Sequence, residues 1–159
     1  MSVAFTREED LEAAAADLAD RPISPHPNLV TAAGLAAIDG ALHAARAAYG
    51  AAQTGEDVKA DRTAMARATR DLRYWLARRA NAQLTPPPDD RGVARFGCAV
   101  TFEREDGRRQ TFRIVGEDEA DPARGAVSYV SPLAQALLGK RVGDVVLLAG
   151  AEIEIVGIG

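Results

Sequence analysis

The sequence has few residues of the types that build metal and disulfide sites. Cys98 is the only cysteine among the 159 residues, which excludes an internal disulfide and any zinc site made from several cysteines. The only histidines are His26 and His43, and His26 lies between two prolines with no partner ligands nearby in the sequence. The sequence therefore does not predict a histidine metal site.

Long apolar runs and aromatic residues are also scarce. No run approaches the roughly 20 apolar residues that span a bilayer, and the acidic N-terminus does not resemble a secretory signal. We therefore expect a cytoplasmic protein that makes no membrane contact. Aromatic residues are 5% of the chain, and alanine, which buries little area per residue, supplies much of the apolar content. This composition favours a narrow pair of helices over a thick core.

Positive charge is concentrated in the middle of an acidic chain. Residues 29–83 hold eight bases and five acids, whereas residues 1–28 hold six acids and two bases. The formal net charge of −4 argues against a general duplex binder, and no aromatic residues are interleaved with the bases to stack on nucleic acid. A basic helix face is more often simply solvated, and that interpretation stays open beside nucleic-acid contact.

Proline and periodicity divide the chain into three segments. Residues 1–28 are an acidic, proline-rich extension with three prolines between Pro22 and Pro27, which favour extended backbone. Residues 29–84 then show two heptad seams separated by a turn at Gly55. The two seams predict an antiparallel coiled-coil helical hairpin, with Thr31 as its N-cap.

The seam residues can be read directly from the spacing of apolar side chains. In the first helix they are Leu35, Ile38, Leu42, Ala45, Tyr49 and Ala52, and in the second Met65, Ala68, Leu72, Trp75 and Ala82, with Arg79 in register. Tyr74 and Trp75 are expected to anchor the base of the hairpin.

Residues 89–159 follow Pro86-Pro87-Pro88 and read as a small α+β domain. Alternating strand patterns and a turn at Glu105-Asp106-Gly107 predict an antiparallel sheet. One short helix is expected after Ser131, with Ser131 as its N-cap, Pro132 at its first position and Gly139 at its end.

Several ordered motifs in this last segment resemble the C-terminal, FKBP-like domain of the Gre transcript-cleavage factors. The matching pieces are Phe96-Gly97, Arg113-Ile114-Val115-Gly116, Asp118-Glu119-Ala120-Asp121, Ser131-Pro132, Ala136-Leu137-Leu138-Gly139-Lys140 and Val142-Gly143-Asp144. The hairpin is similar too, whereas residues 1–28 match nothing in the best-known members. The FKBP-like fold does not by itself imply prolyl isomerase activity.

The resemblance implies a transcription elongation factor that binds RNA polymerase core enzyme at its secondary channel. It would act as an accessory through the polymerase active site rather than as a free-standing enzyme, and it would meet nucleic acid only through the polymerase. The family's docking region falls on Ser131 and Pro132, although helix capping alone explains both residues.

The hairpin tip departs from the family pattern Gly-Asp-x-x-Glu-Asn-Ala. Here Asp57 takes the first acid's place, the second falls on Ala60, and Asp61 comes one residue late. Asp57 and Asp61 can still share a helical face and serve as catalytic carboxylates that bind Mg²⁺ within the polymerase; the chain alone is expected to bind no cofactor. The alternative is that Glu56 and Asp57 only offset the helix dipole.

Three functions stay open on this basis. The arms are roughly six to eight residues, or about 10 Å, shorter than is usual in the family. The leading expectation is a Gre-like elongation factor. The second is a regulator or inhibitor that occupies the secondary channel without promoting cleavage. A third, outside transcription, is a helical-hairpin adaptor for another assembly.

Overall fold

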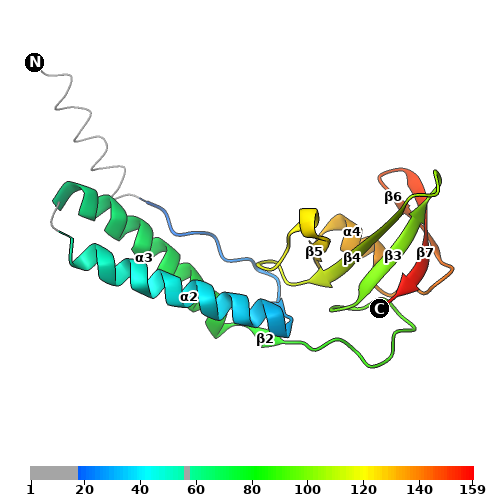
Figure 1. Ribbon diagram of the computed structural model, residues 1–159, viewed down its shortest axis with the longest axis horizontal. Coiled ribbons are helices and arrows are strands. Elements are labelled where there is room, and N and C mark those ends of the chain that lie inside the picture. The colour runs from blue at the N-terminus through cyan, green and yellow to red at the C-terminus, as the bar shows by residue number, and fades with distance from the viewer. Residues whose placement is uncertain (1–17, 56–57) are drawn as a thin grey trace, which may run out of the picture. The chain divides into compact units, whose positions relative to one another are not determined.

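The computed structural model describes residues 18–55 and 58–159, without the side chains of residues 58–61. Contacts divide the chain into two compact units. Of the described residues, one unit holds 18–25, 38–55 and 58–81, and the other holds 26–37 and 82–159. Figure 1 shows the long helices α2 and α3, which make up most of the first unit, and the curled sheet of the second.

The predicted helical hairpin is present. It consists of α2 (Ala32–Gln53) and α3 (Val58–Ala80). Thr31 caps α2 as expected, because its Oγ1 accepts a hydrogen bond from the Gly34 backbone N–H at 2.9 Å. The first seam is confirmed at its centre, where Ile38, Leu42 and Ala45 are buried.

The base of the second helix differs from the predicted seam. Arg78 is the buried arginine, with 1% of its surface exposed. Arg79 lies on the exposed side instead, where its Nε donates to Asp39 Oδ1 at 2.6 Å. A long arginine side chain can extend its charged end into solvent. The place of Arg79 in the heptad register therefore does not require that its side chain be buried.

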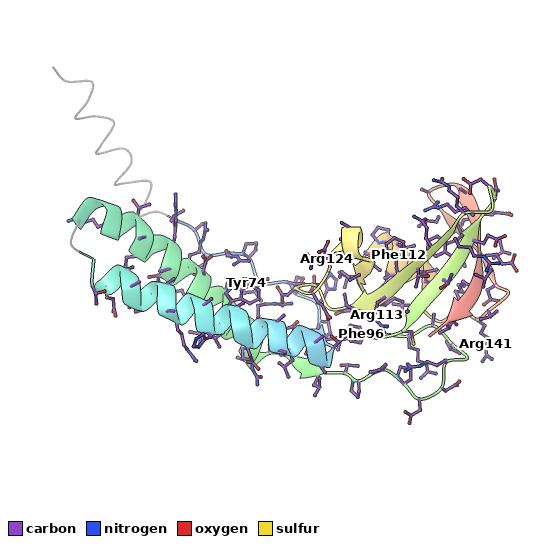
Figure 2. The ribbon with its side chains drawn as sticks, viewed as in Figure 1. Tyr74, Phe96, Phe112, Arg113, Arg124 and Arg141 are labelled. Atoms are coloured by element: carbon purple, nitrogen blue, oxygen red, sulfur yellow. The ribbon has the colours of Figure 1, made fainter. Side chains whose placement is uncertain are left out.

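The connector before the hairpin packs on α3, which the sequence did not predict. The Arg21 guanidinium lies 3.8 Å from the Tyr74 ring centroid and 5.5 Å from that of Trp75. Its Nη1 also contacts Asp71 Oδ1 at 3.4 Å. Figure 2 labels Tyr74 on the helix that receives this contact. The aromatic pair thus anchors the connector through Arg21.

We expect Arg21→Ala to release this connector from α3. A cation–π contact at a partly exposed site contributes about 0.5–1 kcal/mol, so residues 18–25 should become more accessible to protease while the hairpin stays folded. Trp75 is the only tryptophan, and its emission should shift with the change. Arg73→Ala is the matched control, because the Arg73–Asp20 pair is about two-thirds exposed and should contribute little. Equal protease sensitivity of the two variants would contradict the anchoring role.

The second unit contains a five-stranded sheet in the order β5-β4-β3-β7-β6. The bounds of its elements are β3 Ala99–Arg104, β4 Arg109–Val115, η1 Pro122–Arg124, β5 Ala126–Ser128, α4 Pro132–Leu137, β6 Val145–Leu148 and β7 Ala151–Ile158. The α+β class with one short α-helix is confirmed.

The sheet is mixed rather than purely antiparallel. β3 pairs antiparallel with β4 and β7, and β6 pairs antiparallel with β7, whereas β5 runs parallel to β4. A parallel neighbour needs a connection long enough to return the chain to the start of the strand. Residues 116–125, which include η1, supply that connection. The length of this segment was the one feature of the sequence that could have indicated a parallel β5.

A second, small sheet joins two segments that are distant in sequence. β1 (Leu29–Val30) pairs parallel with β2 (Gln83–Leu84). Beside it, Gly116 passes so close to the Leu29 carbonyl oxygen that a Cβ at position 116 would overlap it. Residues 26–37 are therefore packed as part of the sheet unit, while the domain boundaries at residues 28, 84 and 89 stay predictions.

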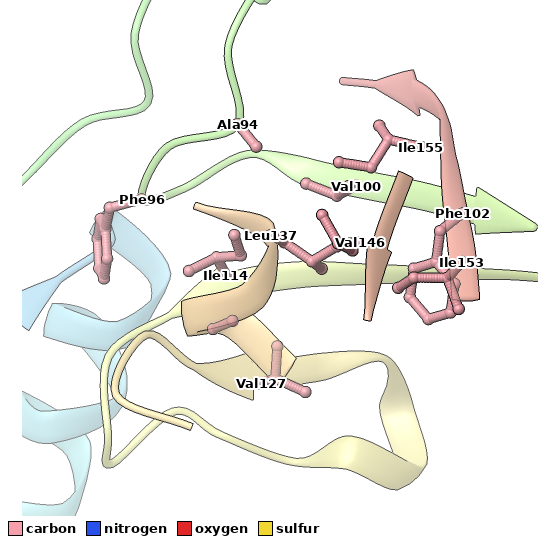
Figure 3. Packing of buried hydrophobic residues seen from close by; sticks show 11 residues of the cluster. Ala94, Phe96, Val100, Phe102, Ile114, Val127, Leu137, Val146, Ile153 and Ile155 are labelled. Carbon is pink, nitrogen blue, oxygen red and sulfur yellow. The ribbon is translucent and has the colours of Figure 1, made fainter. Parts of the chain in front are cut away.

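One apolar core holds the sheet unit together. Figure 3 shows side chains of the central strands and α4 meeting in its interior. The fully buried members include Val100, Phe102, Ile114, Leu137 and Ile155. This core fixes which residues of each strand face outward.

Candidate docking corner and hairpin tip

The region around Ser131 and Pro132 forms a corner between β5 and α4. Ser131 Oγ accepts a hydrogen bond from the Ala134 backbone N–H at 3.2 Å, and Pro132 opens the helix. Both residues thus have the capping positions predicted from the sequence. Pro132 is exposed and Ser131 is half-buried, so the corner presents the proline ring to solvent.

A network of hydrogen bonds holds this corner in one conformation. The Gln135 backbone N–H donates to Ser131 O at 2.9 Å, and Gln135 Nε2 donates to Tyr129 O at 2.7 Å. The Tyr129 hydroxyl donates to Pro27 O, and the Phe96 ring packs edge-on against the Tyr129 ring with centroids 5.8 Å apart. Figure 2 labels Phe96. The exposed proline therefore stands on a rigid base.

The acidic loop before the corner contacts the start of α2. Thr31 Oγ1 donates to Glu119 Oε2 at 2.6 Å while it accepts from the Gly34 N–H. The carboxylate thereby lies near the N-terminus of a long helix, where the helix dipole favours negative charge. A Cβ on Gly34 would lie 2.6 Å from Glu119 Oε2. The absence of a side chain at position 34 thus permits this close approach.

Sequence reasoning missed Glu119 as a partner of Thr31 and Tyr129 as a partner of Pro27. Their contacts join residues far apart in the chain, and no local pattern encodes them. The pKa of Asp106 is lowered by the backbone N–H and the guanidinium of Arg108, but this carboxylate belongs to the β3–β4 turn rather than to the corner.

The acidic side chains of the hairpin tip are not among those that the structure describes. Asp57 and Glu56 lie outside the described residues, and Asp61 lies in α3 without a described side chain. Elsewhere in the described part of the chain, no group of three or more His, Cys, Asp or Glu side chains could hold a metal ion. No described helix is long and apolar enough to cross a membrane. The role of Asp57 and Asp61 in metal binding stays a prediction.

Comparison with known proteins identifies relatives of the sheet unit. The family described as "Transcription elongation factor, GreA/GreB, C-term" matches residues 88–158. Transcription elongation factor GreB of Neisseria meningitidis serogroup B is 40% identical over 91 residues, covering 53% of this chain and 56% of that protein. GreA of Alkalilimnicola ehrlichii is 47% identical over 70 residues, covering 42% and 44%. The chain thus spans about half the length of these relatives.

Among solved structures, GreA factor homolog 1 (Gfh1) of Thermus thermophilus is 24% identical. The alignment covers 84% of this chain and 99% of that one, with a TM-score of 0.40. At this score the likeness carries no further argument.

Proposed function

We propose that this chain is a Gre-like factor that binds bacterial RNA polymerase core enzyme, because residues 88–158 match the C-terminal domain of the GreA/GreB transcription elongation factors. The sheet unit docks through the corner at Ser131 and Pro132, and the hairpin enters the secondary channel. The observation that carries this proposal is the family match over residues 88–158, which include the corner. The chain acts as an accessory to the active site of the polymerase.

The geometry of the corner supports this use. Docking favours rigid exposed groups, because little conformational freedom is then lost on binding. Pro132 is exposed. The preceding residue, Ser131, accepts hydrogen bonds from the backbone N–H groups of Ala134 and Gln135. The hairpin supports the second part of the proposal, since 22 and 23 residues give two arms of nearly equal length, each about 33 Å.

A second candidate, a channel regulator that does not promote cleavage, is favoured by the tip sequence. Ala60 has no carboxylate at the place of the family's second acid. Both candidates share the docking step and differ in chemistry at the tip. Binding and cleavage must therefore be measured separately.

We expect a double change, Ser131→Asp with Pro132→Glu, to weaken binding to core enzyme about tenfold or more. The change adds two charges to the docking corner, and charge juxtaposed wrongly in an interface costs affinity. It should leave α4 intact, because aspartate is a good N-cap and an acid in the first turn is favourable. Binding is measured by displacement of a labelled authentic Gre factor from core polymerase.

Ser131→Ala is the matched control. It removes the cap, at a cost of about 0.5–2 kcal/mol in helix stability, but adds neither bulk nor charge to the surface. We expect it to bind core enzyme nearly as well as the unchanged chain. Failure of the unchanged chain to bind would refute the polymerase assignment, and equal binding of the charged variant would move the docking surface elsewhere.

A further inference from the structure

The β6 edge of the sheet is short, at four residues, but it carries neither the charged side chain nor the proline that often protects an edge strand. β6 and β5 lie at opposite ends of the strand order (Figure 1). The β6 sequence is Val145-Val146-Leu147-Leu148, without a charge or a proline. Natural edge strands usually carry lysine, proline or a bulge that prevents pairing with another chain. β6 is therefore open to a further strand.

The outward side chains of this edge are apolar and exposed. Val146 is buried in the core, so its neighbours along the strand point to the other face. Val145 is 56% and Leu147 69% exposed, and nearby Val142 is 58% exposed. These are half of the six large apolar side chains that are exposed in the described part of the chain. A grouped apolar patch of this kind is typical of an interaction site.

Carboxylates line the same face beside the apolar edge. Val145 pairs with Glu154, and Leu147 pairs with Glu152. Glu154 in turn stands opposite Glu103 of β3, an arrangement of like charges that destabilises a sheet. Together with Glu105, these acids border a groove of about 250 Å³ that also touches Val145. Arg104 is the one base that lines the groove, and its Nε donates to Gln110 Oε1 at 2.6 Å rather than to a carboxylate.

Only part of this negative charge is compensated. Arg109 Nε lies 2.8 Å from Glu103 Oε2. The side chains of Glu105, Glu152 and Glu154 make no ion pair or hydrogen bond with any described residue. The unfavourable pairing of Glu154 with Glu103 is therefore relieved only on the β3 side, and a cation placed over β7 would relieve the rest.

From these features we infer that β6 and the carboxylates beside it form a second protein-docking surface, which binds an extended basic segment of a partner. The segment adds as a strand to β6 through backbone hydrogen bonds. Because side chains alternate along a strand, its lysines or arginines reach Glu152 and Glu154 while its backbone follows β6. This surface is separate from the corner at Ser131 and does not depend on polymerase binding.

Charge favours this occupant over a second copy of the chain. Antiparallel pairing of β6 with β6 of another copy would place both sets of Glu152 and Glu154 on one face of a continuous sheet. That arrangement adds negative charge to a face on which Glu154 already stands opposite Glu103. A basic segment removes the repulsion instead.

The test uses the isotopically labelled full chain and a short capped peptide of alternating lysine and valine. We expect saturable shifts of the backbone amides of Val145–Leu148 in NMR spectra, with affinity that falls as salt rises from about 0.05 to about 0.5 M. Two control peptides define the mode of binding. Glutamate in place of lysine should abolish the shifts, and N-methylation at alternate backbone positions should abolish them as well, because it removes the strand hydrogen bonds.

Variants with matched controls locate the surface. Leu147→Lys should weaken peptide binding about tenfold or more, since covering a leucine side chain contributes about that factor. Leu84→Lys, at a position of similar exposure, should not. Glu152→Gln with Glu154→Gln should weaken binding about three- to tenfold, whereas Asp89→Asn should have no effect.

Four outcomes would overturn the inference. If the glutamate peptide binds as tightly as the lysine peptide, charge does not drive binding. If the N-methylated peptide does so, the peptide does not bind as an added strand. Absence of shifts at Val145–Leu148 at saturating peptide would remove the surface itself. A concentration-dependent dimer that Leu147→Lys dissociates would assign the edge to a second copy.

Discussion

Backtracked RNA polymerase complexes are expected to cleave their transcript little or not at all faster when this chain is added. In the family pattern two acids at the tip act together on Mg²⁺ in the polymerase. Here Ala60 stands at the place of the second acid, and Asp61 comes one residue later. By the spacing of the sequence motifs, the arms are also expected to be about 10 Å shorter than is usual in the family. Since a displacement of about 1 Å from the reacting geometry can cost about a hundredfold in rate, the tip should not complete the site.

The same chain should nevertheless compete with an authentic Gre factor for the polymerase, because the proposed docking corner lies in the sheet unit and not at the hairpin tip. Changing Asp57 and Asp61 together to alanine should leave this competition nearly unaltered. The measurement is transcript cleavage in assembled backtracked complexes, with an authentic Gre factor as the positive control. Asp39→Ala with Asp71→Ala, which removes two hairpin acids away from the tip, controls for net charge.

Robust cleavage by the unchanged chain that disappears in the Asp57→Ala, Asp61→Ala variant would contradict this expectation. It would show that the shifted pair of acids forms a working Mg²⁺ site and that docking compensates for the shorter arms. Weak cleavage that survives the double change would instead assign the residual effect to occupation of the channel.

Gly116→Ala is expected to lower the free energy of unfolding of the sheet unit by about 2–3 kcal/mol. The added methyl group would overlap the carbonyl oxygen of Leu29. Overpacking against backbone costs this much because the strand itself must move. The displaced strand is β1, so its pairing with β2 should weaken as well. Urea unfolding followed by circular dichroism measures the change. Hydrogen exchange of the Gln83 and Thr85 amides, which donate to Asn28 O and Val30 O, locates it.

Two other glycine substitutions provide a graded control. Gly40→Ala should stabilise the chain by about 0.4–1 kcal/mol, because the position is helical and nothing lies within 4 Å of the new Cβ. Gly34→Ala should fall between the two. Its Cβ meets Glu119 Oε2, the end of a flexible side chain that can swing away at the cost of its hydrogen bond to Thr31. Equal unfolding of the Gly116 and Gly34 variants would contradict the backbone clash.

For the candidate site, the sequence predicted the local capping roles of the residues but not their part in docking. The capping roles of Ser131 and Pro132 were predicted because capping depends on neighbours within four residues, and the structure confirms them. Their service in docking rests on family resemblance and stays a proposal. Asp57 and Asp61 are known only from the sequence, since the described structure contains neither side chain.

The sequence by itself determined the features that depend on local periodicity and capping. These are the two helices and their Ile38–Leu42–Ala45 seam, the Thr31 cap, the strand segments of residues 89–159 and the short helix after Ser131. Heptad spacing, alternation and turn residues encode such features within a window of a few residues. The tertiary structure alone decided the parallel pairing of β5 with β4, the β1–β2 sheet, the contact of Arg21 with Tyr74 and the exposed β6 edge. Each of these features depends on which residues, distant in sequence, become neighbours in space. Packing of the whole unit determines those neighbours, and no local sequence pattern does.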